Sequence, residues 1–259
     1  MIRFFIGYCW GAAGSRWLAR LLNSSEDILC LHSPILPRFD HNIYDDSIEI
    51  LRWFFHQRHG HPIVGFTHAI PLEWHESISQ EFGYRLRCFV LTRHPIPRIQ
   101  SAYELNKRQQ HIREHDPFWQ EAMKGPYEEL TSITRKEFSR DFTALGFYKA
   151  CKLVNSVQEE MQSRLPMFKL EDLVSSEMTA NKLAEYISEG TVELRAPAIR
   201  KLKNITVGSH TARKRTAEEI YLGWSPEFRQ AYHFLVRPES LGFYNGLGYV
   251  FPHDLERET

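Results

Sequence analysis

Short apolar runs alternate with longer amphipathic segments along most of this chain of 259 residues. Runs rich in Val, Ile, Leu and Phe are typical of strands buried on both faces of a parallel sheet. These runs are 2–6, 27–32, 62–68 and 86–92. Apolar positions at helical spacing predict helices between and after them, at 15–22, 71–82 and 96–106. Strands that alternate with helices predict an α/β fold, in which helices flank a central, mostly parallel sheet.

The second half of the chain predicts one more strand and several helices. A long amphipathic helix is expected over 141–164, a short strand over 167–170, and a helix from 171 to about 187. Ser225-Pro226-Glu227 is typical of the start of a last helix. The length fits a single domain over 1–259, and the charged segment 107–140 is an exposed insertion or a lid over a binding site.

The first predicted strand ends in a glycine-rich turn that leads into a helix. Gly7, Gly11 and Gly14 interrupt the apolar pattern, and Ser15 begins the helical one. Backbone N–H groups of such a turn point at one spot, and the helix dipole adds positive potential there. The turn is therefore predicted to bind phosphate. The common form GxxxxGK[ST] is absent, which argues against an ordinary ATP or GTP hydrolase.

Polar side chains also follow the other predicted strands. His32 follows the second strand, His68 ends the third, and Arg93 follows the fourth. Because the carboxyl ends of parallel strands meet at one edge, where ligands bind, we expect a phosphate-handling site there. Arg93 and Ser101 are placed to hold one phosphate between a guanidinium fork and a hydroxyl. The alternative is that Arg93 is a loop charge and Ser101 a solvent-facing helix residue.

Composition narrows the class of protein. The formal net charge is zero, so no overall field favours nucleic acid or an anionic membrane. The longest apolar runs are too short to cross a membrane, and the first residues lack the regions of a signal peptide. Four scattered cysteines without a CxxC pair indicate a reducing, cytoplasmic location. Thirteen histidines without a ligand spacing predict no metal site.

Four segments, in this order, resemble the signatures of sulfotransferases that use 3′-phosphoadenosine 5′-phosphosulfate (PAPS). Residues 11–18, GAAGSRWL, resemble the 5′-phosphosulfate loop PKSGTTWL, and residues 65–71, GFTHAIP, resemble the KTHLP segment with its catalytic histidine. Residues 92–103 resemble the 3′-phosphate motif RNPxDxxxSxY, with the same spacing of eight between arginine and serine. Residues 169–173, KLEDL, resemble the YEDL segment. The resemblance implies a P-loop-containing, sulfotransferase-like fold.

The resemblance also implies a role for each matched residue. Arg93 and Ser101 would bind the 3′-phosphate, and His68 would be the general base that takes the proton of an acceptor hydroxyl. A fainter match at 213–227 suggests a basic loop over the 3′-phosphate, formed by Arg213, Lys214 and Arg215. The 5′-phosphosulfate loop would comprise Gly11, Ala13, Gly14, Ser15 and Arg16, with Trp17 stacked on adenine.

The chain departs from the family pattern at three positions. Ala12 replaces the loop lysine, Phe66 replaces the lysine before Thr-His, and Leu170 replaces the tyrosine on the adenine side. The transferred group and its leaving phosphate still need positive charge. We expect Arg16 and the helix N-terminus to supply it. His32 is the rival base, because it also ends a predicted strand.

The implied reaction is in-line transfer of a sulfuryl group from PAPS to a hydroxyl of a small-molecule or carbohydrate acceptor, without a metal. The aromatic stretch 51–55, the segment 107–140 and the glycine-aromatic tail are candidates to line the acceptor pocket. Two alternatives stay open. A phosphotransferase needs a loop lysine and a magnesium carboxylate, and a non-catalytic nucleotide-binding module needs no base. The sequence does not indicate an oligomeric state.

Overall fold

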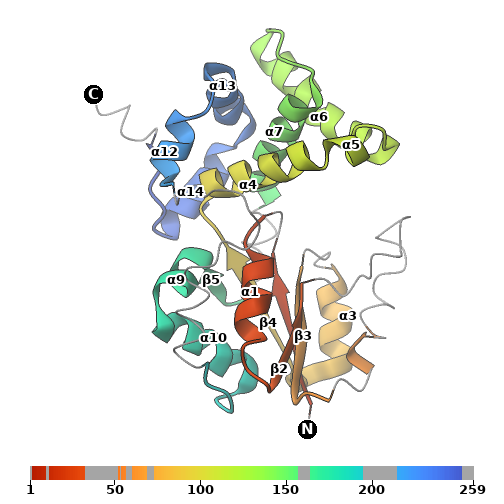
Figure 1. Ribbon diagram of the computed structural model, residues 1–259, viewed down its shortest axis with the longest axis vertical. Coiled ribbons are helices and arrows are strands. Elements are labelled where there is room, and N and C mark those ends of the chain that lie inside the picture. Colours follow the sequence, from red (N-terminus) through yellow and green to blue (C-terminus); the bar gives the residue numbers. More distant parts are fainter. Residues whose placement is uncertain are drawn as a thin grey trace. The chain divides into compact units, whose positions relative to one another are not determined.

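A computed structural model describes residues 2–9, 12–32, 52, 54–56, 60–68, 73–156, 164–194 and 215–252 (Figure 1). The chain divides into two compact units, and each is described by itself. Unit 1 is Met1–Thr92 with Ser163–Gly208, and unit 2 is Arg93–Gln162 with Ser209–Thr259. The single domain over 1–259 stays a prediction.

Unit 1 is built on a five-stranded sheet in which every described pairing is parallel. The strands lie in the order β2-β3-β1-β4-β5. Their bounds are β1 Arg3–Tyr8, β2 Ile28–Leu31, β3 Ile63–His68, β4 Leu86–Thr92 and β5 Met167–Lys169. All five were expected from the apolar runs, so the predicted α/β fold with a central parallel sheet is confirmed.

Helices cover both faces of this sheet (Figure 1). Phe5, Phe89 and Leu91 pack on one face with the apolar sides of α1 (Ser15–Leu22) and α10 (Glu177–Ser188). Their neighbours along the strands, such as Phe4 and Val90, pack on the other face with α3 (Glu73–Phe82). Successive strand residues point to opposite faces, and burial of both faces explains why the strands read as continuous apolar runs.

Unit 2 consists of helices packed around aromatic side chains. Phe147 of α7 (Phe142–Lys152) stacks on Phe228 with ring centroids 4.1 Å apart, and Trp224 meets Phe147 edge-on at 5.0 Å. The buried guanidinium of Arg98 donates to the hydroxyl of Tyr244 at 2.7 Å. The described α-helices are α4 Pro95–Arg108, α5 Gln110–Arg113, α6 Pro117–Thr134, α7 Phe142–Lys152, α12 Ala217–Leu222, α13 Pro226–Leu235 and α14 Pro238–Gly246.

Two predicted helices differ from the structure in extent. The α-helix expected over 141–164 ends at Lys152 and continues as the 3₁₀ helix η2 (Leu153–Ser156), while 157–163 lie outside the described residues. The helix expected from 171 to 187 is divided into α9 (Leu170–Ser175) and α10, because the Ser176 hydroxyl caps α10. Of the aromatic stretch 51–55, residues 52, 54 and 55 are helical and the others lie outside the description.

The charged segment 107–140 forms helices, and one of its faces is buried. Helix α6 carries Met123, Tyr127 and Leu130 inward, and these three residues are buried. Asp116 caps α6 by accepting from the backbone N–H of Phe118 at 2.9 Å. The segment is therefore an integral part of unit 2. Within the described ranges, no helix combines the length and apolar character needed to cross a membrane.

Gly65 in the middle of β3 fits a register in which β3 lies against Phe5 of β1. A Cβ atom built on Gly65 would fall on the carbonyl oxygen of Phe5 and lie 2.5 Å from its ring. We expect Gly65→Ala to lower the free energy of unfolding by about 3 kcal/mol, because the backbone oxygen has no room to move.

Gly242→Ala is the matched control, because Gly242 lies in helix α14 with nothing within 4 Å of an added Cβ. This variant should gain up to about 1 kcal/mol. Urea denaturation of both variants checks the prediction, and equal stability of Gly65→Ala and the wild type would contradict the register.

Candidate functional site

The turn between β1 and α1 adopts the conformation of an anion-binding loop. Ala12 has φ 54° and Gly14 has φ 96°, while Ala13 between them is not in the left-handed region. Alternation of this kind turns successive backbone N–H groups toward the same side. Gly14 is the N-cap of α1, and within α1 no side chain caps the helix and no acidic residue lies in the first turn. The positive end of the helix dipole is therefore not neutralised locally.

Two side chains hold this turn in place. A Cβ on Gly14 would lie 2.5 Å from a methyl group of Leu170, so Leu170 packs directly on the glycine. The hydroxyl of Thr67 in β3 donates to the carbonyl oxygen of Ser15 at 3.2 Å. Leu170 therefore supports the turn. Thr67 was not singled out in the sequence, although its place beside His68 is a signal for it.

Arg16, His32 and His68 gather at the carboxyl edge of unit 1. His68 ends β3, its carbonyl oxygen accepts from the N–H of Cys9 at 3.3 Å, and its ring lies 5.8 Å from that of His32. Arg16 is exposed in the first turn of α1, and its charge acts on His32. The structure thus brings together three of the residues singled out from the sequence.

His32 is held in the neutral form. Burial lowers the pKa of His32 to about 4, with further lowering by the charges of His68 and Arg16, and the backbone of Thr67 partly opposes this. The Nδ1 atom of His32 is buried, and none of the described residues forms a hydrogen bond with it. Because a general base works best with a pKa near the operating pH, His32 is poorly matched to that role.

Trp17 and Ala13 lie largely inside unit 1. Ala13 is 2% exposed, and Trp17 is 8% exposed in the core that α1 shares with α10. An indole in this position contributes most of its surface to packing. Its stacking on adenine stays a prediction.

Arg93 and Ser101, the residues predicted to bind a 3′-phosphate, lie in unit 2. The guanidinium of Arg93, which follows Thr92 in the chain, donates to the hydroxyl of Ser101 on α4 at 2.9 Å. The two side chains therefore meet, and their role in holding a phosphate stays a prediction. His94 between them is structural: its Nδ1 accepts from the N–H of Ile96 at 3.2 Å, and its Nε2 donates to the carbonyl oxygen of Val250 at 3.0 Å. His94 thus caps α4 and ties it to the C-terminal segment.

The late segment contributes to unit 2 through Trp224. Its indole N–H donates to the side-chain oxygen of Gln100 at 2.7 Å, a contact that the sequence did not predict because it joins positions 124 apart. Arg215 is exposed directly before Thr216, whose side chain forms a capping box with Glu219 at the start of α12. Gly11, Arg213 and Lys214 lie outside the described residues.

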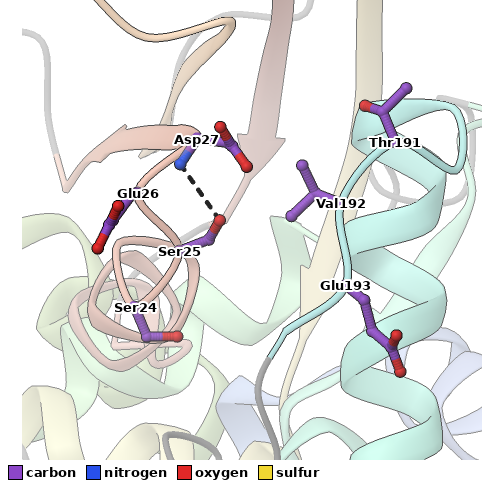
Figure 2. A pocket seen from close by; sticks show the side chains of 7 residues that line it. All are labelled: Ser24, Ser25, Glu26, Asp27, Thr191, Val192 and Glu193. Atoms are coloured by element: carbon purple, nitrogen blue, oxygen red, sulfur yellow. Dashed lines mark hydrogen bonds between the residues drawn. The ribbon is translucent and has the colours of Figure 1, made fainter.

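A cavity of about 220 Å³ lies in unit 1 near the amino end of β2 (Figure 2). Ser24–Asp27, just before β2, face Thr191–Glu193, which follow α10, and the N–H of Asp27 bonds to the hydroxyl of Ser25 at 3.3 Å. Glu26, Asp27 and Glu193 make the cavity acidic. An anionic ligand is repelled by such a lining, so the cavity is not a candidate for a phosphate site.

Among the described residues, no three His, Cys, Asp or Glu side chains lie close enough together to hold a metal ion. The predicted phosphate-binding residues of each unit instead present cationic and hydroxyl groups. Arg16 belongs to unit 1, and Arg93 and Ser101 belong to unit 2. Such groups suit the oxygens of phosphate and sulfate.

Comparison with solved structures finds a likeness in fold. A sulfotransferase from Alicyclobacillus acidocaldarius, known from its crystal structure, aligns with 91% of this chain and 96% of its own at 14% identity and a TM-score of 0.44. No family model matches the chain, and no curated protein does. At this level the likeness does not identify a family, and the functional argument below depends on the chain's own residues.

The neutral state of His32 predicts a pH dependence of stability. In the unfolded chain His32 binds a proton near its ordinary pKa of 6.5, whereas in the folded chain it does so only near 4. The unfolded state therefore binds more protons between these values, and the free energy of unfolding should fall as pH drops from about 6.5 to about 4. Urea denaturation at steps of pH checks this. The wild type should lose more stability over this window than His32→Gln, and equal slopes would contradict the prediction.

Proposed function

We propose that the protein is a sulfotransferase that moves the sulfuryl group of PAPS to a hydroxyl of a small-molecule or carbohydrate acceptor. The observation that carries the proposal is the gathering of Arg16, His32 and His68 beside the uncapped N-terminus of α1. This arrangement combines positive potential for a leaving phosphate with an imidazole at the same sheet edge.

Each unit offers groups that suit one end of the proposed donor. The turn from Ala12 to Arg16 offers backbone N–H groups and a guanidinium, which suit the 5′-phosphosulfate. The Arg93–Ser101 pair offers a guanidinium and a hydroxyl that already meet, which suit a 3′-phosphate. A donor with charged groups at both ends of an adenosine would use both sets of groups.

His68 is the proposed general base, and Arg16 the proposed source of positive charge. His32 stays neutral at neutral pH, so it adds no repulsion when His68 takes the proton of the acceptor hydroxyl. Arg16 replaces the lysine that the family carries at the position of Ala12. Transfer is in-line through a loose transition state, in which charge spreads over the equatorial oxygens. Arg16 and the α1 dipole would stabilise that charge.

Donor binding tests the role of the Arg93–Ser101 pair. Calorimetry compares 3′-phosphoadenosine 5′-phosphate with AMP, which lacks the 3′-phosphate. We expect the wild type to prefer the bisphosphate, and Arg93→Met to weaken its binding by ten- to a hundredfold with little change for AMP, because a charge-assisted bond to the 3′-phosphate is lost.

Arg108→Met is the control for charge, because Arg108 also lies on α4 but bonds to the carbonyl oxygen of Glu104. It should leave binding of the bisphosphate unchanged. No binding of the bisphosphate by the wild type would reject the proposed function.

Turnover separates the two candidate bases. With radiolabelled sulfate in PAPS and a panel of hydroxyl compounds, His68→Ala should lower kcat by about 10²–10⁴-fold and leave bisphosphate binding intact. His32→Ala should lower kcat far less, because His32 is not the base. The reverse order would assign the base to His32.

Arg16→Ala in the same assay measures how much the charge of Arg16 stabilises the transition state. We expect a loss of at least about tenfold in kcat with a smaller change in donor affinity. A near-normal kcat would show that the helix N-terminus suffices. ATP as donor distinguishes a phosphotransferase, and binding without turnover of either donor indicates a nucleotide-binding module.

A further inference from the structure

Two cations lie against one indole in unit 2. The guanidinium carbon of Arg113, at the end of α5, and the ammonium nitrogen of Lys149 on α7 are each 3.8 Å from the ring centroid of Trp119 on α6. All three side chains are half-buried. Both cations are thus fixed on the same ring, which the described helices place away from the Arg93–Ser101 end of α4.

Neither cation has a carboxylate partner among the described residues. Arg113 donates to the amide oxygen of Asn106, a neutral group, and Asn106 in turn donates to the carbonyl oxygen of Gly146 at 3.2 Å. Lys152, one turn further along α7, differs: its ammonium group lies 2.6 Å from the carboxylate of Glu129. The indole face attracts a cation but carries no net charge, so the two charges at Trp119 are not neutralised.

The two charges are also desolvated. Burial lowers the pKa of Arg113 to about 10, and burial together with the charge of Arg113 lowers the pKa of Lys149 to about 8. Two like charges that are removed from water and close together create a strong local positive potential. An anion that binds there relieves both the repulsion and the loss of hydration.

Apolar surface borders this charge pair. Phe118 lies edge-on to Trp119 at 5.8 Å and is 61% exposed. Ile112, next to Arg113, is 62% exposed. Exposed large apolar side chains beside a charge cluster are typical of a surface that receives a ligand with an apolar or sugar-like body.

A cavity of about 490 Å³ lies along the same two helices. Its lining includes Met123 of α6 and Leu145 of α7. These residues are four positions from Trp119 and Lys149 respectively, so each shares a helix face with a member of the cluster. The cavity lies in the size range of sites for small ligands.

We propose that Arg113 and Lys149, which lie against the ring of Trp119, bind the anionic group of an acidic acceptor, a carboxylate or sulfate on a sugar-like body that extends into the α6–α7 cavity. This proposal rests on the proposed function only where it calls the ligand an acceptor. The anion site itself depends on unit 2 alone.

Direct binding tests the site without any donor nucleotide. The probes share one sugar ring and differ at C6: glucuronate carries a carboxylate, glucose 6-sulfate carries a sulfate, and glucose is neutral. Tryptophan fluorescence is titrated at constant ionic strength, and Trp119→Phe identifies the signal of Trp119. We expect saturable quenching by one or both acidic sugars and none by glucose.

Lys149→Met and Lys152→Met form a matched pair on α7. Loss of one charge-assisted bond should weaken binding of the acidic sugar about tenfold in Lys149→Met. Lys152→Met should bind as the wild type, because Lys152 already pairs with Glu129. Lys149→Met also removes a repulsion, so it is expected to fold, which its melting curve checks. Equal binding by wild type and Lys149→Met, or an equal response to glucose, would overturn the proposal.

Turnover then tests whether the ligand of this site is an acceptor substrate. With PAPS as donor, Lys149→Met should raise KM for methyl glucuronide about tenfold, leave kcat unchanged, and leave KM for methyl glucoside unchanged. A protein that binds glucuronate but not the bisphosphate would refute the proposed function and keep the anion site. A protein that binds the bisphosphate but shows no difference between Lys149→Met and Lys152→Met would refute the anion site alone.

Discussion

The N-terminus of α1 is the feature on which the rest of the candidate site depends. Its dipole is left uncapped within the helix, and the turn that precedes it bends through left-handed conformations at Ala12 and Gly14. Such a turn holds its shape only where the surroundings determine it. Leu170 packs on Gly14, and Thr67 bonds to the carbonyl oxygen of Ser15. Positive potential at this edge is thus built by backbone geometry, supported by neutral side chains.

Packing and charge are supplied by different residues around this turn. Leu170 fills the space above Gly14, a glycine that cannot accept a Cβ. The turn and the start of α1 contain no lysine, and Arg16 is the cation there. Arginine keeps its charge at any pH of interest and holds oxygens with a planar fork. Packing therefore secures the turn, and an arginine beyond it carries the charge.

Much of the fold was readable from the sequence, because continuous apolar runs and helical spacing are local signals. The five strands and the start of α1 followed from them. The break at Ser176, the end of the long helix at Lys152 and the whole of α14 did not, because each depends on capping or on packing between distant segments. The meeting of Arg93 with Ser101 was predicted from the end of β4 and the short spacing to the helix that follows. By contrast, the bond from Trp224 to Gln100 and the contact of Leu170 with Gly14 join segments far apart, and no local pattern reports them.

Charge in this protein is balanced overall but not locally. Away from the candidate sites, several cations pair with carboxylates: Glu189 binds both Arg3 and Arg87, and Glu129 binds Lys152. At Trp119 the described structure pairs two cations with an aromatic ring instead, and both lose hydration there. Burial of a charge without a counter-ion lowers the free energy of unfolding. The charge pair at Trp119 therefore costs stability as long as no ligand is bound. An anion brought by a ligand removes that cost, and the same reasoning applies to the uncapped N-terminus of α1, where we propose that the donor binds.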